Sequence, residues 1–132
     1  MELFHPGDHY AHTFLISREV YVGFGNIFQD RNPLHTDEEF AKAKGFPGFV
    51  MYGNILNGFL SFFIGECLPT KDVIIHTQEI QYKKAVFLDD SLELDAEITD
   101  TFDSVNVVQF KYRFSRSGEV VAKGKFQIGI LV

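Results

Sequence analysis

The sequence has little cysteine, proline or methionine and no tryptophan: one Cys, four Pro and two Met occur among 132 residues. The single Cys67 excludes an intrachain disulfide framework and a zinc site made of several cysteines, and it is typical of a reducing compartment. No apolar run approaches the ~20 residues of a membrane-spanning helix, because the most apolar stretch, residues 59–64, is far too short. The N-terminus lacks a basic segment and an apolar signal region. We therefore expect a soluble protein of the cytoplasm with no membrane partner.

Basic residues are also few, since 12 Lys and Arg stand against 18 Asp and Glu, for a net charge of −6. Sequence-independent nucleic-acid binding depends on a basic surface, so this charge balance disfavours it, and we expect no nucleic-acid partner. Phenylalanine, in contrast, is abundant at 15 copies. So much aromatic bulk indicates a thick core or a pocket for an apolar ligand. The length and composition fit one domain over residues 1–132 that needs no covalent or metal staple.

The second half of the chain, from residue 72 onward, is predicted to be almost entirely β-strand. Apolar and polar residues alternate over residues 92–98, 108–114 and 120–128, which is the period of a half-buried strand. A longer segment, residues 73–87, comes before them. Because short polar breaks separate these segments, we expect four successive strands joined by hairpin turns into an antiparallel meander.

The first half is predicted to supply the helices that cover the dry face of this sheet. Residues 53–67 are apolar around most of the helical circumference and stop before Pro69, which predicts a long buried helix. Three shorter elements precede it: a strand over residues 12–16, a helix over residues 17–28 capped by Ser17, and a helix that starts in a capping box at residues 36–39 and ends at Gly45. A curved antiparallel sheet wrapped around a long central helix is the hot-dog architecture, of the α+β class.

One strip of the long helix is small and polar. Its members follow helical spacing of three and four: Asn54, Asn57, Gly58, Ser61 and Gly65. One interpretation is that the glycines allow close backbone packing and the amides are satisfied inside the fold. The other is that the strip lines a substrate channel. The spacing does not choose between them.

An acid and an imidazole lie close together between the two short helices. Asp30 and His35 flank an Asn32-Pro33 pair, in which the proline fixes its own φ and biases Asn32 toward extended geometry. Such a turn can hold Asp30 and His35 as a paired acid and base. An Asn-Pro turn, a capping Asp and a solvated loop His are also common, so spacing alone favours a structural role.

The segment Asp30-x-Asn32-Pro33-Leu34-His35-x-Asp37 resembles the hydratase motif of the MaoC-like, (R)-specific enoyl-CoA hydratases. Further residues fall on the pattern of that family: Ala41, Gly45, Phe46, Val50, Gly53, Leu56, Ser61, Leu68 and Pro69. The resemblance covers most of the chain and implies a hot-dog homodimer that adds water across a trans-2-enoyl thioester, or removes it from a 3-hydroxyacyl thioester. The substrate would be carried by CoA or by an acyl-carrier protein, with no cofactor and no metal.

The resemblance also implies roles for individual residues. Asp30 and His35 would be the catalytic pair that handles the water, and the Gly53 N–H would bind the thioester oxygen. The implied substrate-binding residues are Asn32, Tyr52, Asn54, Asn57 and Ser61, with Asn32 bracing the motif loop. General chemistry agrees with these roles. A carboxylate and an imidazole that bind one water can take the proton that the water loses and supply the proton that Cα gains. A backbone N–H at a helix N-terminus can donate to the enolate oxygen.

Two positions depart from the usual pattern of the family. Phe28-Gln29 stands where many members have Ser-Gly, and Tyr52 stands where most have His before Gly53. Both changes keep the proton-transfer groups but add bulk, so we expect a preference for short or medium acyl chains. They also leave open a non-catalytic acyl-thioester-binding hot-dog subunit. A hot-dog thioesterase is a further alternative, which the intact Asp30/His35 motif disfavours.

A metal site is a weaker interpretation of the histidine-rich N-terminus. His5, Asp8, His9 and His12 have spacing loosely compatible with metal ligation, but a solvated segment explains them more simply. We therefore expect no metal.

Overall fold

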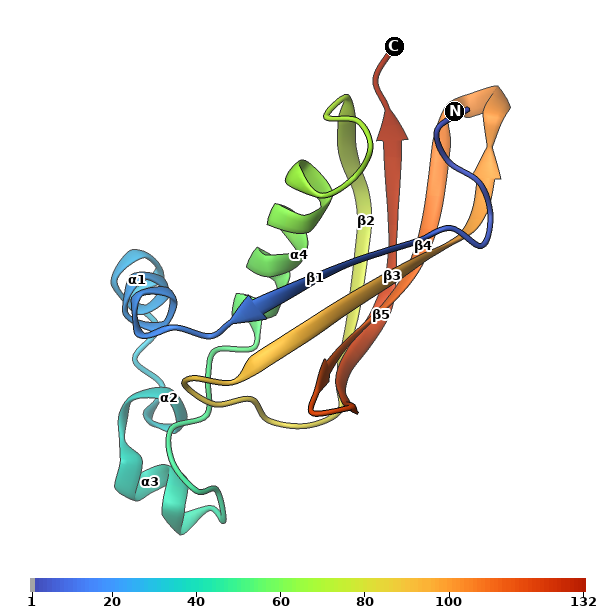
Figure 1. The fold of residues 1–132 in the computed structure, drawn as a ribbon. Helices are drawn as coiled ribbons and strands as arrows, with labels where there is room; N and C mark the ends of the chain where they lie inside the picture. The colour runs from blue at the N-terminus through green and yellow to red at the C-terminus, as the bar shows by residue number, and fades with distance from the viewer. Residues whose placement is uncertain (1) are drawn as a thin grey trace.

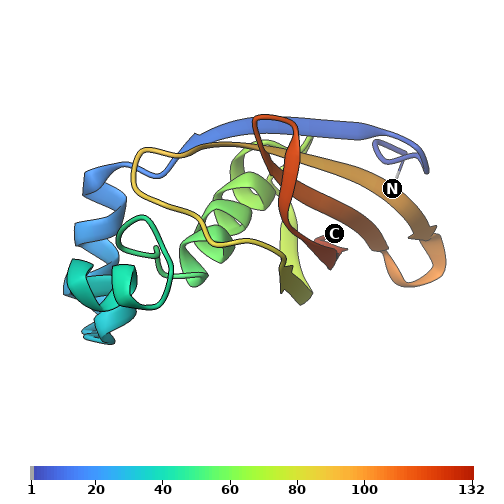
Figure 2. The ribbon, with the colours of Figure 1, turned by 90° about the horizontal axis from the view of Figure 1, so that it is seen from below.

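The structure, a computed structural model, describes residues 2–132. Its elements are β1 (His9–Leu15), α1 (Arg18–Phe28), α2 (Pro33–Thr36), α3 (Glu38–Ala43), α4 (Asn54–Glu66), β2 (Val73–Tyr82), β3 (Ser91–Phe102), a 3₁₀ turn (Asp103–Val105), β4 (Val107–Arg116) and β5 (Glu119–Ile130). The strands form one curved sheet, with α4 beneath it and α1 to α3 gathered beyond one end (Figures 1 and 2). None of the helices within residues 2–132 has the length and hydrophobicity that a membrane crossing requires.

The five strands are antiparallel and lie in the order β1-β3-β4-β5-β2. The predicted meander of four successive strands is therefore wrong for β2, which pairs with β5 and not with β3. The reason is the segment over residues 83–90, which does not turn back as a hairpin. Instead it joins the end of β1, where the Ile16 N–H donates to the Asp90 carbonyl oxygen at 2.9 Å and the Asp89 N–H donates to the Ile16 carbonyl oxygen at 2.8 Å.

The helix boundaries follow their caps. Ser17 caps α1 as predicted, because its hydroxyl accepts from the Val20 N–H at 3.1 Å. The expected capping box is shifted by one residue, since Asp37 and not Thr36 is the N-cap of α3, and its carboxylate accepts from the Phe40 N–H. Thr36 instead ends the short helix α2, which the sequence analysis did not predict.

The core lies between the sheet and one face of α4. Side chains of β3, β4 and β5 alternate between buried and accessible, as the period of two predicts. Large members of this core include Phe110, Phe114 and Phe126 from the sheet and Leu60, Phe63 and Ile64 from α4. The predicted all-round burial of α4 is wrong, because a single sheet covers only one side. Phe62 is 48% exposed, and Ser61 and Gly65 of the polar strip are exposed as well.

The strand at the outer edge of the sheet, β2, exposes large apolar side chains among polar ones. Ile74 and Ile75 of this strand are exposed, as is Tyr82 at its end. Only one side of β2 is paired, to β5, so its other side presents a free row of backbone groups.

Candidate active site

The motif loop, which we define as residues 30–35, begins where α1 ends. Gln29 closes α1 in the left-handed conformation, at φ 61°. Asp30 Oδ1 then accepts from the Asn32 N–H at 3.0 Å, and Asn32 Oδ1 accepts from the Leu34 N–H at 2.9 Å as the N-cap of α2. With Pro33 at the first position of that helix, the loop is held by its own side chains. Asn32 therefore braces the loop, and its side-chain oxygen is already in use.

A short hydrogen bond orients the ring of His35. Its Nδ1 lies 2.6 Å from the Val50 carbonyl oxygen. Because a carbonyl oxygen only accepts, Nδ1 carries the hydrogen and donates it. The neutral ring then has its lone pair on Nε2, ready to accept a proton. Residues 2–132 contain no direct hydrogen bond between the Asp30 and His35 side chains.

Tyr52 connects these two residues from behind the loop. It is 3% exposed, its hydroxyl donates to the Asp30 carbonyl oxygen at 3.1 Å, and its ring centroid lies 4.5 Å from that of His35. Burial raises the pKa of the Tyr52 phenol, and nearby Tyr21 and Asp30 raise it further. The phenol is thus kept protonated, as a donor must be. Tyr52 is thus a buried contact of both residues of the predicted catalytic pair, and its predicted role in substrate binding stays a prediction.

An apolar groove of about 830 Å³ opens beside Asp30, between α1 and α4. We call it the α1–α4 groove. Its lining comprises Val20, Phe24, Ile27, Phe28, Asp30, Asn54, Ile55, Asn57, Gly58 and Phe59. Three members of the predicted polar strip, Asn54, Asn57 and Gly58, therefore share a cavity with Asp30. Ser61 and His35 are outside this lining, and Phe28 lies within it.

The two amides of the strip are hydrogen-bonded to each other and to β2. Gln78 Nε2 donates to Asn57 Oδ1 at 2.8 Å, and Asn57 Nδ2 donates to Asn54 Oδ1 at 2.9 Å. The Tyr82 hydroxyl donates to the same Asn54 oxygen at 3.5 Å. The amides are thus satisfied, as the first interpretation predicted, but its close packing at the glycines is wrong, because a Cβ at Gly58 or Gly65 would meet no atom within 4 Å. That the strip lines a substrate channel stays a prediction.

Gly53 is the N-cap of α4, the 13-residue helix. Its N–H forms no hydrogen bond within residues 2–132. A Cβ at this position would stand 3.0 Å from Cε1 of Tyr82, tighter than ordinary contact. Glycine therefore lets Tyr82 pack against the start of the helix while the N–H stays available to an acceptor.

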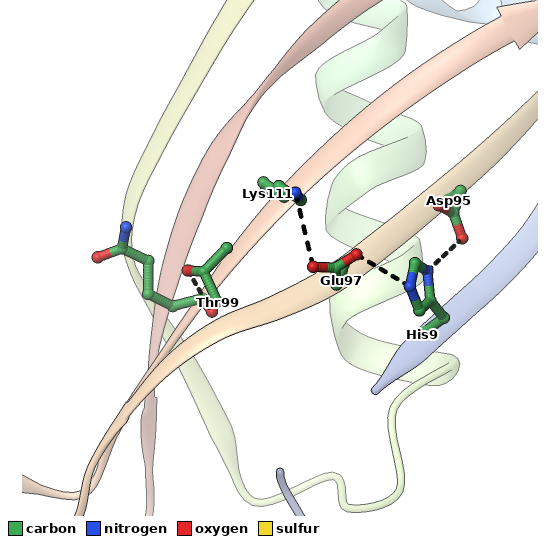
Figure 3. Close-up of polar contacts among 6 residues, drawn as sticks. His9, Asp95, Glu97, Thr99 and Lys111 are labelled. Carbon is green, nitrogen blue, oxygen red and sulfur yellow. Dashed lines mark hydrogen bonds and ion pairs between the residues drawn. The ribbon is translucent and has the colours of Figure 1, made fainter. Parts of the chain in front are cut away.

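A second hollow, of about 630 Å³, lies on the outer face of the sheet among charged side chains. There His9 Nδ1 is 3.3 Å from Asp95 and its Nε2 is 2.9 Å from Glu97, which also pairs with Lys111 at 3.5 Å (Figure 3). These are exposed pairs, each contributing about 0–1 kcal/mol. His9 thus faces sheet carboxylates, and residues 2–132 contain no group of three or more His, Cys, Asp or Glu side chains that could hold a metal ion.

Two neighbours of the loop, Tyr21 and Gly25, were missed by the sequence analysis, and Val50 was named there only as a position on the family pattern. The Tyr21 hydroxyl donates to the His35 carbonyl oxygen at 2.5 Å. Tyr21 and Gly25 are four residues apart in α1, so they share a helix face. This spacing is the signal from which a common neighbour could have been predicted. Val50 acts through its backbone carbonyl, for which no side-chain pattern exists.

Comparison with known proteins gives a consistent set of relatives. A family model described as MaoC like domain matches residues 6–117. Proteins named (R)-specific enoyl-CoA hydratase from Rhodospirillum rubrum and Aeromonas caviae are 26% and 28% identical, covering 81% and 79% of this chain and 74% and 78% of the relatives. A 3-hydroxybutyryl-CoA dehydratase of Methylorubrum extorquens is 28% identical, covering 83% of this chain and 70% of the relative.

Solved structures show the same fold. The (R)-hydratase from A. caviae involved in PHA biosynthesis superposes with a TM-score of 0.90 at 22% identity, covering 98% of this chain and 99% of that one. An R-hydratase from Pseudomonas aeruginosa gives a TM-score of 0.87 at 24% identity, covering 97% and 83%. The predicted α+β hot-dog fold is confirmed.

Proposed function

Since this chain belongs to the MaoC-like domain family, we propose that it is a hydro-lyase that interconverts trans-2-enoyl thioesters and 3-hydroxyacyl thioesters by adding or removing water. Three relatives are named for this hydratase or dehydratase chemistry on CoA thioesters. The observation that carries the proposal is the position of Asp30 at an apolar groove, on the same short loop as a histidine whose Nδ1–H is tied to a carbonyl.

In the hydration direction, Asp30 and His35 act on one water. Asp30 Oδ1 is bonded to the Asn32 N–H, so Oδ2 is the oxygen offered to the water, and His35 offers Nε2. As the water oxygen bonds to Cβ, one O–H bond breaks and its proton passes to this pair. The π electrons of the alkene move to Cα, which takes that proton back. The pair is thereby regenerated, and no cofactor is consumed.

Charge develops on the thioester oxygen during this step. The Gly53 N–H, at the positive end of α4, is the donor we assign to it. The acyl chain then lies in the α1–α4 groove against Phe24, Phe28 and Phe59. Asn54 and Asn57 hold the polar edge of that groove, and the bulk of Phe28 in its lining supports a preference for short or medium chains.

We assign a homodimer to this fold, located in the cytoplasm. The free side of β2 carries exposed Ile74 and Ile75, and the exposed strip of α4 with Phe62 and Ser61 lies on the uncovered side of that helix. Pairing two copies through β2 covers an edge that is otherwise an association hazard. Sedimentation at micromolar concentration should give twice the mass of the 15.1 kDa chain. An active monomer contradicts the assignment.

Product analysis with crotonyl-CoA tests the activity and separates the alternatives. Hydration gives 3-hydroxybutyryl-CoA, a thioesterase gives free CoA, and an acyl-binding subunit gives neither while still retaining the ligand. Repeating the assay with the crotonyl thioester of an acyl-carrier protein distinguishes the two carriers by their kcat/KM. Loss of the enoyl absorbance without release of thiol is the expected result.

A further inference from the structure

Two tyrosine hydroxyls that take no part in proton transfer reach the backbone at the two ends of the motif loop. The Tyr52 hydroxyl donates to the Asp30 carbonyl oxygen at 3.1 Å, and the Tyr21 hydroxyl donates to the His35 carbonyl oxygen at 2.5 Å. The two phenol rings stack, with centroids 5.8 Å apart and an interplanar angle of 27°. One stacked pair therefore contacts both residues that carry the acid and the base.

The position of the Tyr52 hydroxyl is set by the packing of its ring. Phe24 stacks on this ring at a centroid distance of 4.7 Å, and the His35 imidazole packs against it at 4.5 Å. Tyr21 in turn stacks on Phe49 at 6.2 Å. Because a phenol has only two side-chain torsions, a buried ring with these neighbours places its oxygen without further freedom.

Gly25 provides the space for this oxygen. A Cβ at position 25 would stand 2.9 Å from Tyr52 Oη, closer than such atoms approach, but 3.6 Å from Cζ, an ordinary contact. Gly25 lies inside α1, where alanine is intrinsically the better residue. A glycine here is unfavourable for the helix, yet it allows the Tyr52 hydroxyl to reach Asp30.

We propose that Tyr52 is a positioning residue for the hydratase reaction. Its hydroxyl holds the backbone of Asp30, its ring packs against the imidazole of His35, and the absence of a side chain at Gly25 leaves room for the hydroxyl. The inference rests on the proposed function of Asp30 and His35. Small displacements of a reacting group lower the rate steeply, so loss of the hydroxyl lowers kcat. Tyr52 is outside the groove lining, so KM stays nearly unchanged.

The test is a double-mutant cycle of Tyr52→Phe and Gly25→Ala, measured as crotonyl-CoA hydration. Tyr52→Phe keeps the ring and removes one hydrogen bond, and we expect kcat to fall about tenfold with KM within about twofold. Gly25→Ala should lower kcat similarly, because its methyl group displaces the same hydroxyl. The double variant should match Tyr52→Phe alone, since the added methyl group then meets only the ring.

Thermal stability gives the cycle a second readout. Gly25→Ala should lower Tm in the wild-type chain, where it strikes the hydroxyl, and raise it in the Tyr52→Phe background, where only the helix preference of alanine remains. Tyr112→Phe is the matched control, because it also removes a buried tyrosine hydroxyl, one that donates to the Glu79 carbonyl oxygen within the sheet. It should leave kcat unchanged.

Amide hydrogen exchange separates this inference from the proposed function. In Tyr52→Phe, the Asn32 and His35 N–H groups, which are bonded within the loop, should exchange faster, whereas the core amide of Phe110 should not. A wild-type chain without hydratase activity contradicts the proposed function, and the exchange result then decides the positioning role. Unchanged exchange, wild-type kcat in folded Tyr52→Phe, or effects of the two substitutions that multiply would overturn the inference.

Discussion

Asp30 and His35 differ in how they are held, although they belong to one loop. The imidazole is oriented by the Val50 carbonyl oxygen on one side and by the Tyr52 ring on its face, whereas the Asp30 carboxylate is held by the Asn32 N–H and is exposed. The Asp30 backbone is held separately, by the Tyr52 hydroxyl. The acid and the base are thus positioned mainly through the protein backbone.

Substitution of either residue should remove most of the activity. We expect Asp30→Asn and His35→Ala each to lower kcat for crotonyl-CoA hydration by about a hundredfold or more, as for the loss of a positioned acid or base. Asp100→Asn and His5→Ala, exposed residues away from the groove, are the matched controls. Near-native activity in a folded Asp30→Asn or His35→Ala variant removes that residue from the catalytic pair.

Chain-length preference should respond to Gly58 more than to Ser61. Gly58 lines the α1–α4 groove, and a Cβ there meets no atom within 4 Å, so Gly58→Leu adds bulk at the groove from an open position. We expect it to lower kcat/KM for an eight-carbon enoyl-CoA by at least about tenfold relative to crotonyl-CoA.

Ser61→Leu is the comparison, because Ser61 lies on the same helix but outside the groove lining of the single chain. If it shifts the chain-length profile as strongly as Gly58→Leu, the channel extends farther along α4, as the sequence analysis predicted. An unchanged profile for both variants excludes the strip from the channel.

At the scale of the element, local sequence signals explain much of the fold. The Ser17 cap, the alternation of β3 to β5 and the stop of α4 before Pro69 were all readable, because each depends on residues close in sequence. The short helix α2 was not predicted, since Asn32-Pro33 is as compatible with a simple turn as with a helix start. The contacts that hold the motif loop come from Tyr21, Val50 and Tyr52, which only the packing of α1 against the start of α4 brings there.

The end of α1 carries a residue in an unfavourable backbone conformation. Gln29 adopts φ 61°, where a residue with a side chain costs about 1–2 kcal/mol, and glycine costs little. We expect Gln29→Gly to raise the free energy of unfolding by about 0.5–1 kcal/mol, after the larger entropy of unfolded glycine is subtracted. Urea unfolding measures the change.

Gly45 gives the opposite test of the same argument. It lies after α3 at φ 94°, so Gly45→Ala should lower the free energy of unfolding by about 1 kcal/mol. If Gln29→Gly also destabilises the protein, the side-chain hydrogen bonds of Gln29, which donates to the Asn26 carbonyl oxygen and accepts from Arg31, outweigh the backbone strain.

At the scale of the whole molecule, sequence reasoning failed where distant segments meet. The strands were identified, but the pairing of β2 with β5 depends on the route of residues 83–90 to the end of β1, which no local pattern encodes. The partial exposure of α4 was missed for a similar reason. Apolar residues around a helix predict that it is buried, but they do not predict that a single sheet covers one side and leaves Phe62 exposed.

The sheet and the motif loop together make the protein sensitive to alkaline pH. Burial is the main cause that raises the pKa of Tyr10, Tyr52, Tyr82 and Tyr112 above the ordinary value of about 10. When the pH passes about 10, these side chains lose protons in the unfolded chain but keep them in the folded one. The unfolded state then binds fewer protons, so the free energy of unfolding falls as pH rises. The contribution of these tyrosines to the free energy of unfolding is fully present below about pH 10 and is lost progressively above it.

Tyr112 should account for the largest share of this loss, since its buried hydroxyl donates to the Glu79 carbonyl oxygen at 2.6 Å and its pKa is raised most. Tyr112→Phe removes that titration at the cost of the hydrogen bond, about 1 kcal/mol. We therefore expect the variant to be less stable than the wild type at pH 8 and to approach it as the pH rises to 11. Urea unfolding at pH 8, 10 and 11 measures both curves. Parallel curves show that the Tyr112 hydroxyl is not the group that limits alkaline stability.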